Sequence, residues 1–169
     1  MISGSERAYL QIIANNLGVN SSDLEKLIKF ESGFNPKAKN PYSSARGLLQ
    51  FTDSTAVSLG FKNSADLVKK HPTVLSQLSV VERYLSQFKP FYGKQSLYMS
   101  VFYPAARNWL SSREFPLSVQ AVNPGIKTPA DYVRKVEGGT VATLAAVPFL
   151  FAAGLITYFI LKQKGERDV

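Results

Sequence analysis

Apolar residues recur along most of the chain at intervals of three and four, the spacing of one helix face. One such stripe includes a carboxylate, at positions i, i+3, i+4 and i+7: Leu24, Leu27, Ile28 and Glu31. No segment shows the sustained alternation of apolar and polar residues that is typical of strands. The pattern therefore predicts an all-α fold.

Residues that favour helix ends divide this pattern into separate helices. Gly18 and Gly33 are the expected stops of the first two, because glycine readily adopts the left-handed conformation that ends a helix. The expected N-caps of the first three helices are Ser5, Ser21 or Ser22, and Asp53. Further helices are expected over 64–70, 73–89 and 93–102.

The chain changes character near its C-terminal end. Residues 140–161 contain no Asp, Glu, Lys or Arg, and a helix of this length reaches about 33 Å, close to the roughly 30 Å hydrocarbon core of a bilayer. We expect a globular domain over 1–137, a single transmembrane helix over 138–162 and a short charged tail over 163–169. A buried core helix is the alternative for the second part. The first twenty residues are too polar for a cleaved signal peptide.

The amino-acid composition excludes several kinds of functional site. The chain has no cysteine and a single histidine, His71, so disulfides, thiol nucleophiles, Cys/His zinc sites and a Ser-His-Asp triad lack their residues. We expect no metal and no cofactor. The net charge of +8 suits polyanions such as wall polymers, anionic lipid or nucleic acid. No basic helix with interleaved aromatic residues is present, so no specific nucleic-acid partner is expected.

Glu31 is the candidate catalytic residue. It lies at the end of an apolar helix face, and the next twelve residues contain no other carboxylate. Apolar surroundings and the negative end of the helix dipole both favour the protonated carboxyl group, which is the form that a general acid needs near neutral pH. The alternative is a glutamate at the edge of the core, paired with a nearby lysine.

The residues around Glu31 carry a family resemblance. The stretches "ESGFNP", "NPYSSARGLLQF" and "DSTA" resemble the lytic transglycosylases, the lysozyme-like enzymes that cleave bacterial peptidoglycan. Glu31 and Ser32 match the family's Glu-Ser pair, and residues 47–50 match its Gly-Leu-(apolar)-Gln motif. "SLYMSVFYPAARN" and "AVNPG" resemble later motifs, although Val122 stands where the family usually has a tyrosine.

The resemblance implies a fold, a substrate and a mechanism. The fold is a lysozyme-like helical domain, and the partner is the glycan strand of peptidoglycan. Glu31 protonates the glycosidic oxygen between N-acetylmuramic acid and N-acetylglucosamine, then acts as base on the C6 hydroxyl of the muramic acid, so that a 1,6-anhydro sugar forms without water. The tethered nucleophile explains the lone acid. The expected substrate-binding residues are Ser32, Gln50, Phe51, Tyr98, Tyr103 and Asn123, with Phe102 beside them in the groove.

Two other functions stay open at this point. One is a hydrolytic muramidase of goose-type character, in which Asp53 or a water held by Gln50 supports hydrolysis. The other is a non-catalytic membrane or wall-binding protein that keeps only the fold.

Chain order suggests a location. A span so late in the chain is expected to insert after synthesis and to leave the domain in the cytoplasm, away from peptidoglycan. A bacteriophage with an internal membrane would bring the domain to its substrate, because its virion displays the domain outward during entry. We therefore expect a single-pass virion membrane protein with capsid or other virion membrane proteins as partners; the alternative is the bacterial inner membrane.

Overall fold

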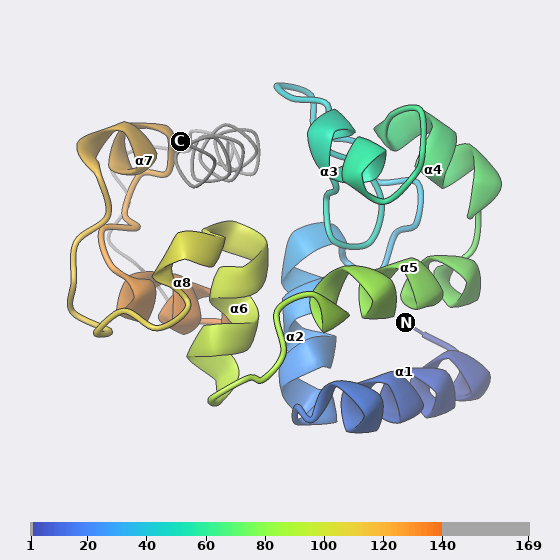
Figure 1. Cartoon of the computed structure of the whole chain (residues 1–169), viewed down its shortest axis with the longest axis horizontal. Coiled ribbons are helices and arrows are strands. Elements are labelled where there is room, and N and C mark those ends of the chain that lie inside the picture. Colours follow the sequence, from blue (N-terminus) through green and yellow to red (C-terminus); the bar gives the residue numbers. More distant parts are fainter. Residues whose placement is uncertain (1, 140–169) are drawn as a thin grey trace, which may run out of the picture.

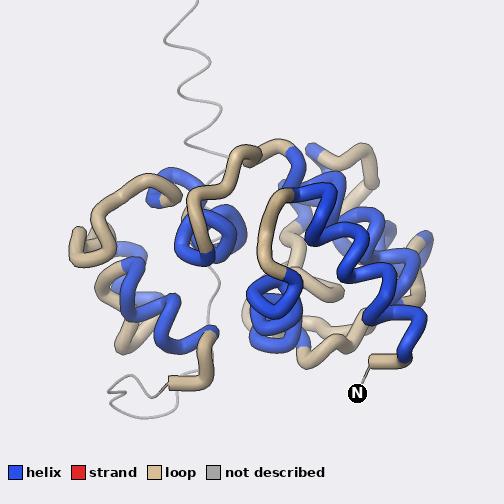
Figure 2. Tube along the Cα trace, turned by 90° about the horizontal axis from the view of Figure 1, so that it is seen from below, coloured by secondary structure: helices blue, strands red, loops and turns tan. Residues whose placement is uncertain are grey.

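The computed structural model describes residues 2–139, and Met1 and residues 140–169 lie outside the described part. Within residues 2–139 every regular element is a helix, as Figure 2 shows, and the only β-type pairings are isolated bridges in one loop. The α-helices are α1 (Gly4–Leu17), α2 (Ser21–Ser32), α3 (Asp53–Ser58), α4 (Ser64–Lys70), α5 (Val74–Ser86), α6 (Lys94–Phe102), α7 (Leu117–Val122) and α8 (Pro129–Val136), with a 3-10 turn, η1 (Pro104–Ala106), after α6.

Helix α2 occupies the middle of the domain. Figure 1 shows α1, α3, α4 and α5 on one side of it and α6, α7 and α8 on the other. Helix α1 packs on α2 and α5, α3 packs on α4, and α6 packs on α8, while α2 contacts both α6 and α8. One continuous hydrophobic core, from Leu10 to Val136, joins the two sides. The C-terminal end of α2 is thereby placed where the two groups of helices meet.

The helix stops agree with the sequence, and the starts differ by one or two residues. Gly18 and Gly33 end α1 and α2 in the left-handed conformation, as predicted. The predicted N-caps Ser5, Ser21 or Ser22, and Asp53 are wrong; the caps are Ser3, Asn20 and Thr52. At each start, a polar residue one or two positions earlier has an extended backbone, and its side chain accepts a hydrogen bond from a backbone amide of the first turn. The predicted residue therefore falls inside the helix.

Of the remaining α-helices in the described part of the chain, three were predicted and two were not. The range 64–70 is α4, and the ranges 73–89 and 93–102 contain α5 and α6, with Thr73 and Gly93 at their N-caps. Helices α7 and α8 were not predicted. Helix α8 does carry a start signal, because Thr128 precedes Pro129 at the first helical position and Asp131 follows as its capping partner.

No helix among residues 2–139 is both long and apolar enough to cross a membrane. The apolar run 140–161, in which the transmembrane helix is expected, lies outside the described residues. The division at 137/138 and the span itself therefore stay predictions.

Candidate active site

Glu31 lies in the last turn of α2, on the helix face that turns toward the core. That face also buries Leu24, Leu27 and Ile28, as the apolar spacing predicts. Only 7% of the surface of Glu31 is exposed. Its Oε1 accepts a hydrogen bond of 2.7 Å from the hydroxyl of Tyr132, and its buried Oε2 has no hydrogen-bond partner among the described residues. One carboxylate oxygen is therefore fixed by the protein.

The protonation of Glu31 follows from this environment. Burial raises the pKa of its carboxyl group to about 8, and the hydrogen bond from Tyr132 opposes part of the rise. Glu31 forms none of the ion pairs found among the described residues, so the alternative of a lysine-paired glutamate is wrong. At neutral pH the group is a protonated acid that ionises within reach of physiological conditions, as a general acid requires.

Tyr132 is the residue that sequence reasoning missed. It comes from α8, 101 residues beyond Glu31, and its side chain is fully buried. Its ring stacks on Phe102 with centroids 4.3 Å apart and meets the edge of Phe30 at 5.6 Å. Burial, together with the nearby Glu31, raises the pKa of its hydroxyl well above the ordinary range. Tyr132 therefore keeps its proton and acts as a hydrogen-bond donor to Glu31.

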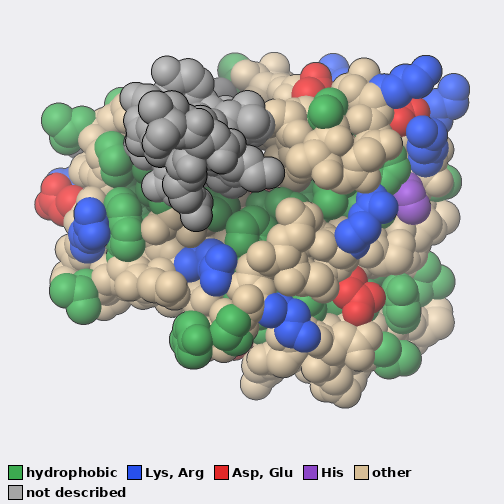
Figure 3. All heavy atoms as spheres, in the orientation of Figure 1, with side chains coloured by type: hydrophobic (Ala, Val, Ile, Leu, Met, Phe, Trp, Pro, Cys, Tyr) green, Lys and Arg blue, Asp and Glu red, His purple; other side chains and the backbone are tan. Residues whose placement is uncertain are grey.

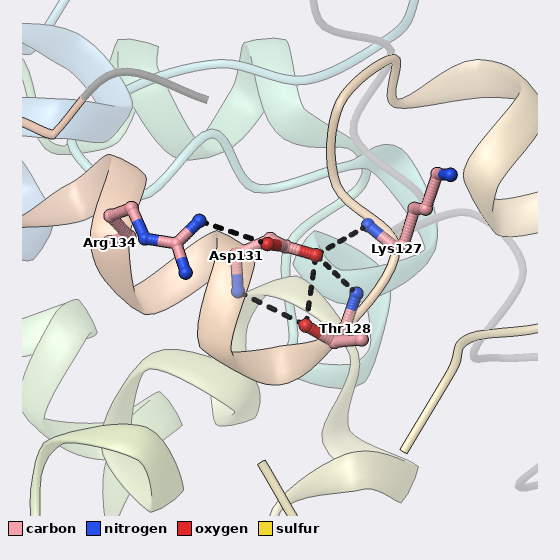
Figure 4. Close-up of polar contacts among 4 residues, drawn as sticks. All are labelled: Lys127, Thr128, Asp131 and Arg134. Atoms are coloured by element: carbon pink, nitrogen blue, oxygen red, sulfur yellow. Dashed lines mark hydrogen bonds and ion pairs between the residues drawn. The ribbon is translucent and has the colours of Figure 1, made fainter. Parts of the chain in front are cut away.

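The start of α8 is fixed by a capping box, drawn in Figure 4. The carboxylate of Asp131 accepts hydrogen bonds from the backbone amides of Lys127 and Thr128, at 3.1 and 3.0 Å, and from the hydroxyl of Thr128 at 2.9 Å. The amide of Asp131 donates in return to the Thr128 hydroxyl, and Arg134 pairs with the other carboxylate oxygen at 3.2 Å. This network sets where α8 begins, a few residues before Tyr132.

The loop after α2 brings the second sequence motif beside the first. Arg46 and Phe51 exchange backbone hydrogen bonds of 3.0 and 2.8 Å, so that residues 47–50 form a tight turn. The buried side chain of Gln77, on α5, accepts from the amide of Leu48 at 2.9 Å and donates to the carbonyl of Pro36 at 2.7 Å. Gln77 therefore ties the turn to the segment that follows Glu31, a role that no sequence pattern indicated.

Three of the predicted binding residues lie near this end of α2. Ser32 donates its hydroxyl to the carbonyl of Ile28, one helical turn back. Gln50 is buried, has a positive φ of 48° and donates its amide to the carbonyl of Gly47 at 3.0 Å. Phe51 is buried against the edge of Tyr84. Burial and the charge of Glu31 both raise the pKa of Tyr84, which places that second tyrosine close to the acid.

The other three predicted binding residues lie on the α6 to α7 side. Tyr98 is fully buried and donates its hydroxyl to Glu137 at 2.6 Å, so it belongs to the core and offers no surface to a glycan. Asn123 is also fully buried, donates to the carbonyl of Val119, and has a side-chain oxygen without a partner among the described residues. Tyr103 is half-buried in an aromatic cluster with Trp109 and Phe115.

Asp53, the candidate second acid of a hydrolase, has a structural partner. Its carboxylate accepts from the amide and the hydroxyl of Ser64, at 2.9 and 2.6 Å. These bonds lower the pKa of Asp53. The residue links the start of α3 to the start of α4, which accounts for its position without a catalytic role.

A helical domain with one buried, protonated carboxylic acid beside a tyrosine donor defines a class, that of lysozyme-like enzymes with a single general acid. A family model described as "Transglycosylase SLT domain" matches residues 8–106, more than half of the chain. The chain therefore belongs to this family, that of the lytic transglycosylases, which cleave peptidoglycan. The match includes Glu31 and Gln50 and ends before Tyr132. Neither the curated proteins nor the solved structures gave a match.

Proposed function

We propose that this protein cleaves the glycosidic bond between N-acetylmuramic acid and N-acetylglucosamine without water and leaves 1,6-anhydro-muramic acid ends. The observation that carries the proposal is the state of Glu31: buried, protonated near neutral pH, and held on one oxygen by Tyr132. No other carboxylate among the described residues contributes to its pKa. A hydrolytic glycosidase of the usual kind needs a second acid beside the first.

The chemistry requires Glu31 to act twice. Its carboxyl proton passes to the glycosidic oxygen as the bond to C1 of the muramic acid breaks, and N-acetylglucosamine leaves with a hydroxyl group. The resulting carboxylate then takes the proton of the C6 hydroxyl, whose oxygen forms the new bond to C1. The acid is thereby restored. Because the nucleophile belongs to the same sugar, proximity replaces a second catalytic side chain.

Tyr132 is placed to stabilise Glu31 between the two proton transfers, when its carboxyl group is ionised. The carboxylate formed in the first step is buried, and a buried charge without a hydrogen bond is strongly disfavoured. The hydroxyl of Tyr132 lies 2.7 Å from Oε1 and keeps its own proton, so it stabilises this carboxylate without neutralising it.

Substrate binding is assigned to residues at the two ends of this site. Ser32, Gln50 and Phe51 line the turn beside Glu31, and the half-buried aromatic cluster of Tyr103 offers a face on which a sugar ring can stack. Tyr98 and Asn123 have no exposed surface, whereas Gln50 and Phe51 keep 5% and 3%, and we assign Tyr98 and Asn123 to support of the walls rather than to contact with the glycan.

The Glu31→Gln variant tests the assignment. It keeps the shape of the side chain and an acceptor for Tyr132 but removes the transferable proton, so cleavage of purified sacculi should fall at least about a hundredfold. Glu25→Gln is the matched control, because Glu25 lies on the same helix and pairs with Arg7 away from the site; it should retain activity. Equal activity of the Glu31→Gln and wild-type proteins would remove Glu31 from the mechanism.

The location is a separate part of the proposal. We infer that residues 140–161 anchor the domain in a bilayer, since the run is uncharged and long enough to cross one. We place that bilayer inside the virion of a membrane-containing bacteriophage, from which the domain reaches the wall during entry, with capsid or other virion membrane proteins as neighbours. Detection of the protein in purified particles supports this location. Its absence there, with the domain digested by protease added to spheroplasts, would favour the bacterial inner membrane instead.

A further inference from the structure

Helices α2 and α8 are joined at two places. The first link is the hydrogen bond from Tyr132 to Glu31, and the second is an ion pair from Lys26 to Glu137, with 2.8 Å between Nζ and Oε2. Lys26 precedes Glu31 by five residues on α2, and Tyr132 precedes Glu137 by five residues at the end of the chain's last described helix. These two links add to the packing of the buried residues of α8 and restrain the helix at two separate points.

The second link is a junction of three elements, which meet at Glu137. This residue caps the C-terminal end of α8. One of its oxygens accepts from Tyr98 of α6 at 2.6 Å, and the other pairs with Lys26 of α2 and, at 3.2 Å, with Lys94 of α6. Hydrogen bonds from Lys26 and Tyr98 lower the pKa of Glu137 to about 2, so the junction keeps its charge over the whole working range of pH.

Helix α8 depends on such a junction. It has only eight residues, and a helix this short is not stable on its own in water. Its catalytic contact is a single hydrogen bond, whose strength falls steeply as the two oxygens separate. A small movement of α8 away from α2 therefore weakens the hydrogen bond between Tyr132 and Glu31.

We propose that Glu137 is a positioning residue, which holds α8 on α2 and α6 so that the hydroxyl of Tyr132 stays within hydrogen-bond distance of Glu31. This proposal rests on the proposed function only in giving Glu31 the role of the acid. The titratable groups that face Glu31 are Tyr132 from α8 and Tyr84 from α5. Those that face Glu137 are Lys26, Lys94 and Tyr98, with Asp23 of α2 beside Lys26 and Tyr98.

The test is an NMR titration of the Glu31 carboxyl carbon in the full chain, with the signal assigned by its loss in Glu31→Gln. Loss of the Tyr132 bond favours the protonated acid, so Glu137→Gln should raise the pKa of Glu31, by up to about one pH unit. Removal of the negative charge at Glu137 acts in the opposite direction, through space, and therefore cannot imitate this rise.

Two further variants keep the result independent of charge and of folding. Tyr98→Phe removes one bond to Glu137 without changing any charge, and it should raise the pKa of Glu31 in the same direction by a smaller amount. Glu25→Gln makes the same charge change as Glu137→Gln on a residue paired with Arg7, and it should not raise the pKa.

The decisive comparison uses Tyr132→Phe. That variant should raise the pKa of Glu31 by itself, and adding Glu137→Gln to it should produce no further rise. An unchanged pKa in both Glu137→Gln and Tyr98→Phe, or a rise in the pKa that Glu137→Gln still causes in the Tyr132→Phe background, would overturn the proposal. Because the titration needs no turnover, a protein inactive on sacculi would refute the proposed function and still allow this inference to be tested.

Discussion

Glu31 is held in a state that costs folding free energy. An isolated glutamic acid ionises near pH 4.5, whereas burial raises the pKa of this one to about 8. Between these two values the unfolded chain releases the proton and the folded protein keeps it. The protein accepts this penalty at one residue, and the residue gains the ability to donate a proton at neutral pH.

Stability should therefore depend on pH through Glu31. Below about pH 4.5 Glu31 is protonated in both the folded and the unfolded state and does not lower the free energy of unfolding. As the pH rises toward 8 the free energy of unfolding falls, and above that pH it levels off. Glu31→Gln lacks this dependence, so its stability relative to wild type should rise between pH 4 and pH 9 by up to roughly 5 kcal/mol. Urea unfolding of both proteins at several pH values measures the difference. Curves that stay parallel over this range would show that the folded pKa of Glu31 is not raised.

At this scale the sequence predicted the acid but not its partner. The spacing of Leu24, Leu27 and Ile28 already placed Glu31 on the buried face of its helix. Tyr132 lies 101 residues away on a helix that was not foreseen, and no local pattern distinguishes it from the other tyrosines. Tyr98, which the third motif favoured as a groove residue, is fully buried and donates its hydroxyl to Glu137.

The turn over residues 47–50 depends on one glycine. Gly47 has a φ of +76°, and a Cβ added to it would lie 2.5 Å from Oε1 of Gln77, which is the atom that accepts from the amide of Leu48. The close approach of backbone and Gln77 is what ties this turn to α5 and to the segment after Glu31. The requirement for glycine here is both conformational and steric.

Gly47→Ala should destabilise the protein by about 2–4 kcal/mol, because the left-handed backbone and the displaced Gln77 each add a cost. Gly18→Ala is the matched control. Gly18 has a similar φ of +71° and no atom within 4 Å of the added Cβ, so its substitution should cost only about 1 kcal/mol. Denaturant unfolding of the two variants gives the comparison. Equal losses would mean that the contact with Gln77 carries no energy.

Elements with a long apolar stripe were the predictable ones. The periodic runs gave α1, α2, α5 and α6 with small errors at their ends, and the shorter α4 was predicted as well. Helices α7 and α8, with six and eight residues, were not predicted, although the Thr128, Pro129 and Asp131 start signal was available for α8. The two helices after η1 are therefore the part of the described fold that the sequence pattern left out.

The domain carries an excess of basic residues, which on the face in view in Figure 3 lie at separate positions except for a group beside α4. Figure 3 shows Lys and Arg side chains at separate positions over this face, with several gathered beside α4, whose last turn contains Lys69 and Lys70. The chain carries a net charge of +8. A dispersed charge of this kind suits attraction to a polyanionic wall better than recognition of one sequence of nucleic acid.

The central claim is that one buried acid performs both proton transfers and that water takes no part. Mass spectrometry of the glycan ends released from purified sacculi tests it most directly. Wild-type protein should release fragments ending in 1,6-anhydro-muramic acid, and Glu31→Gln should release none above background. Fragments ending in reducing muramic acid would contradict it, because they would show that water is the nucleophile and that the protein is a hydrolytic muramidase.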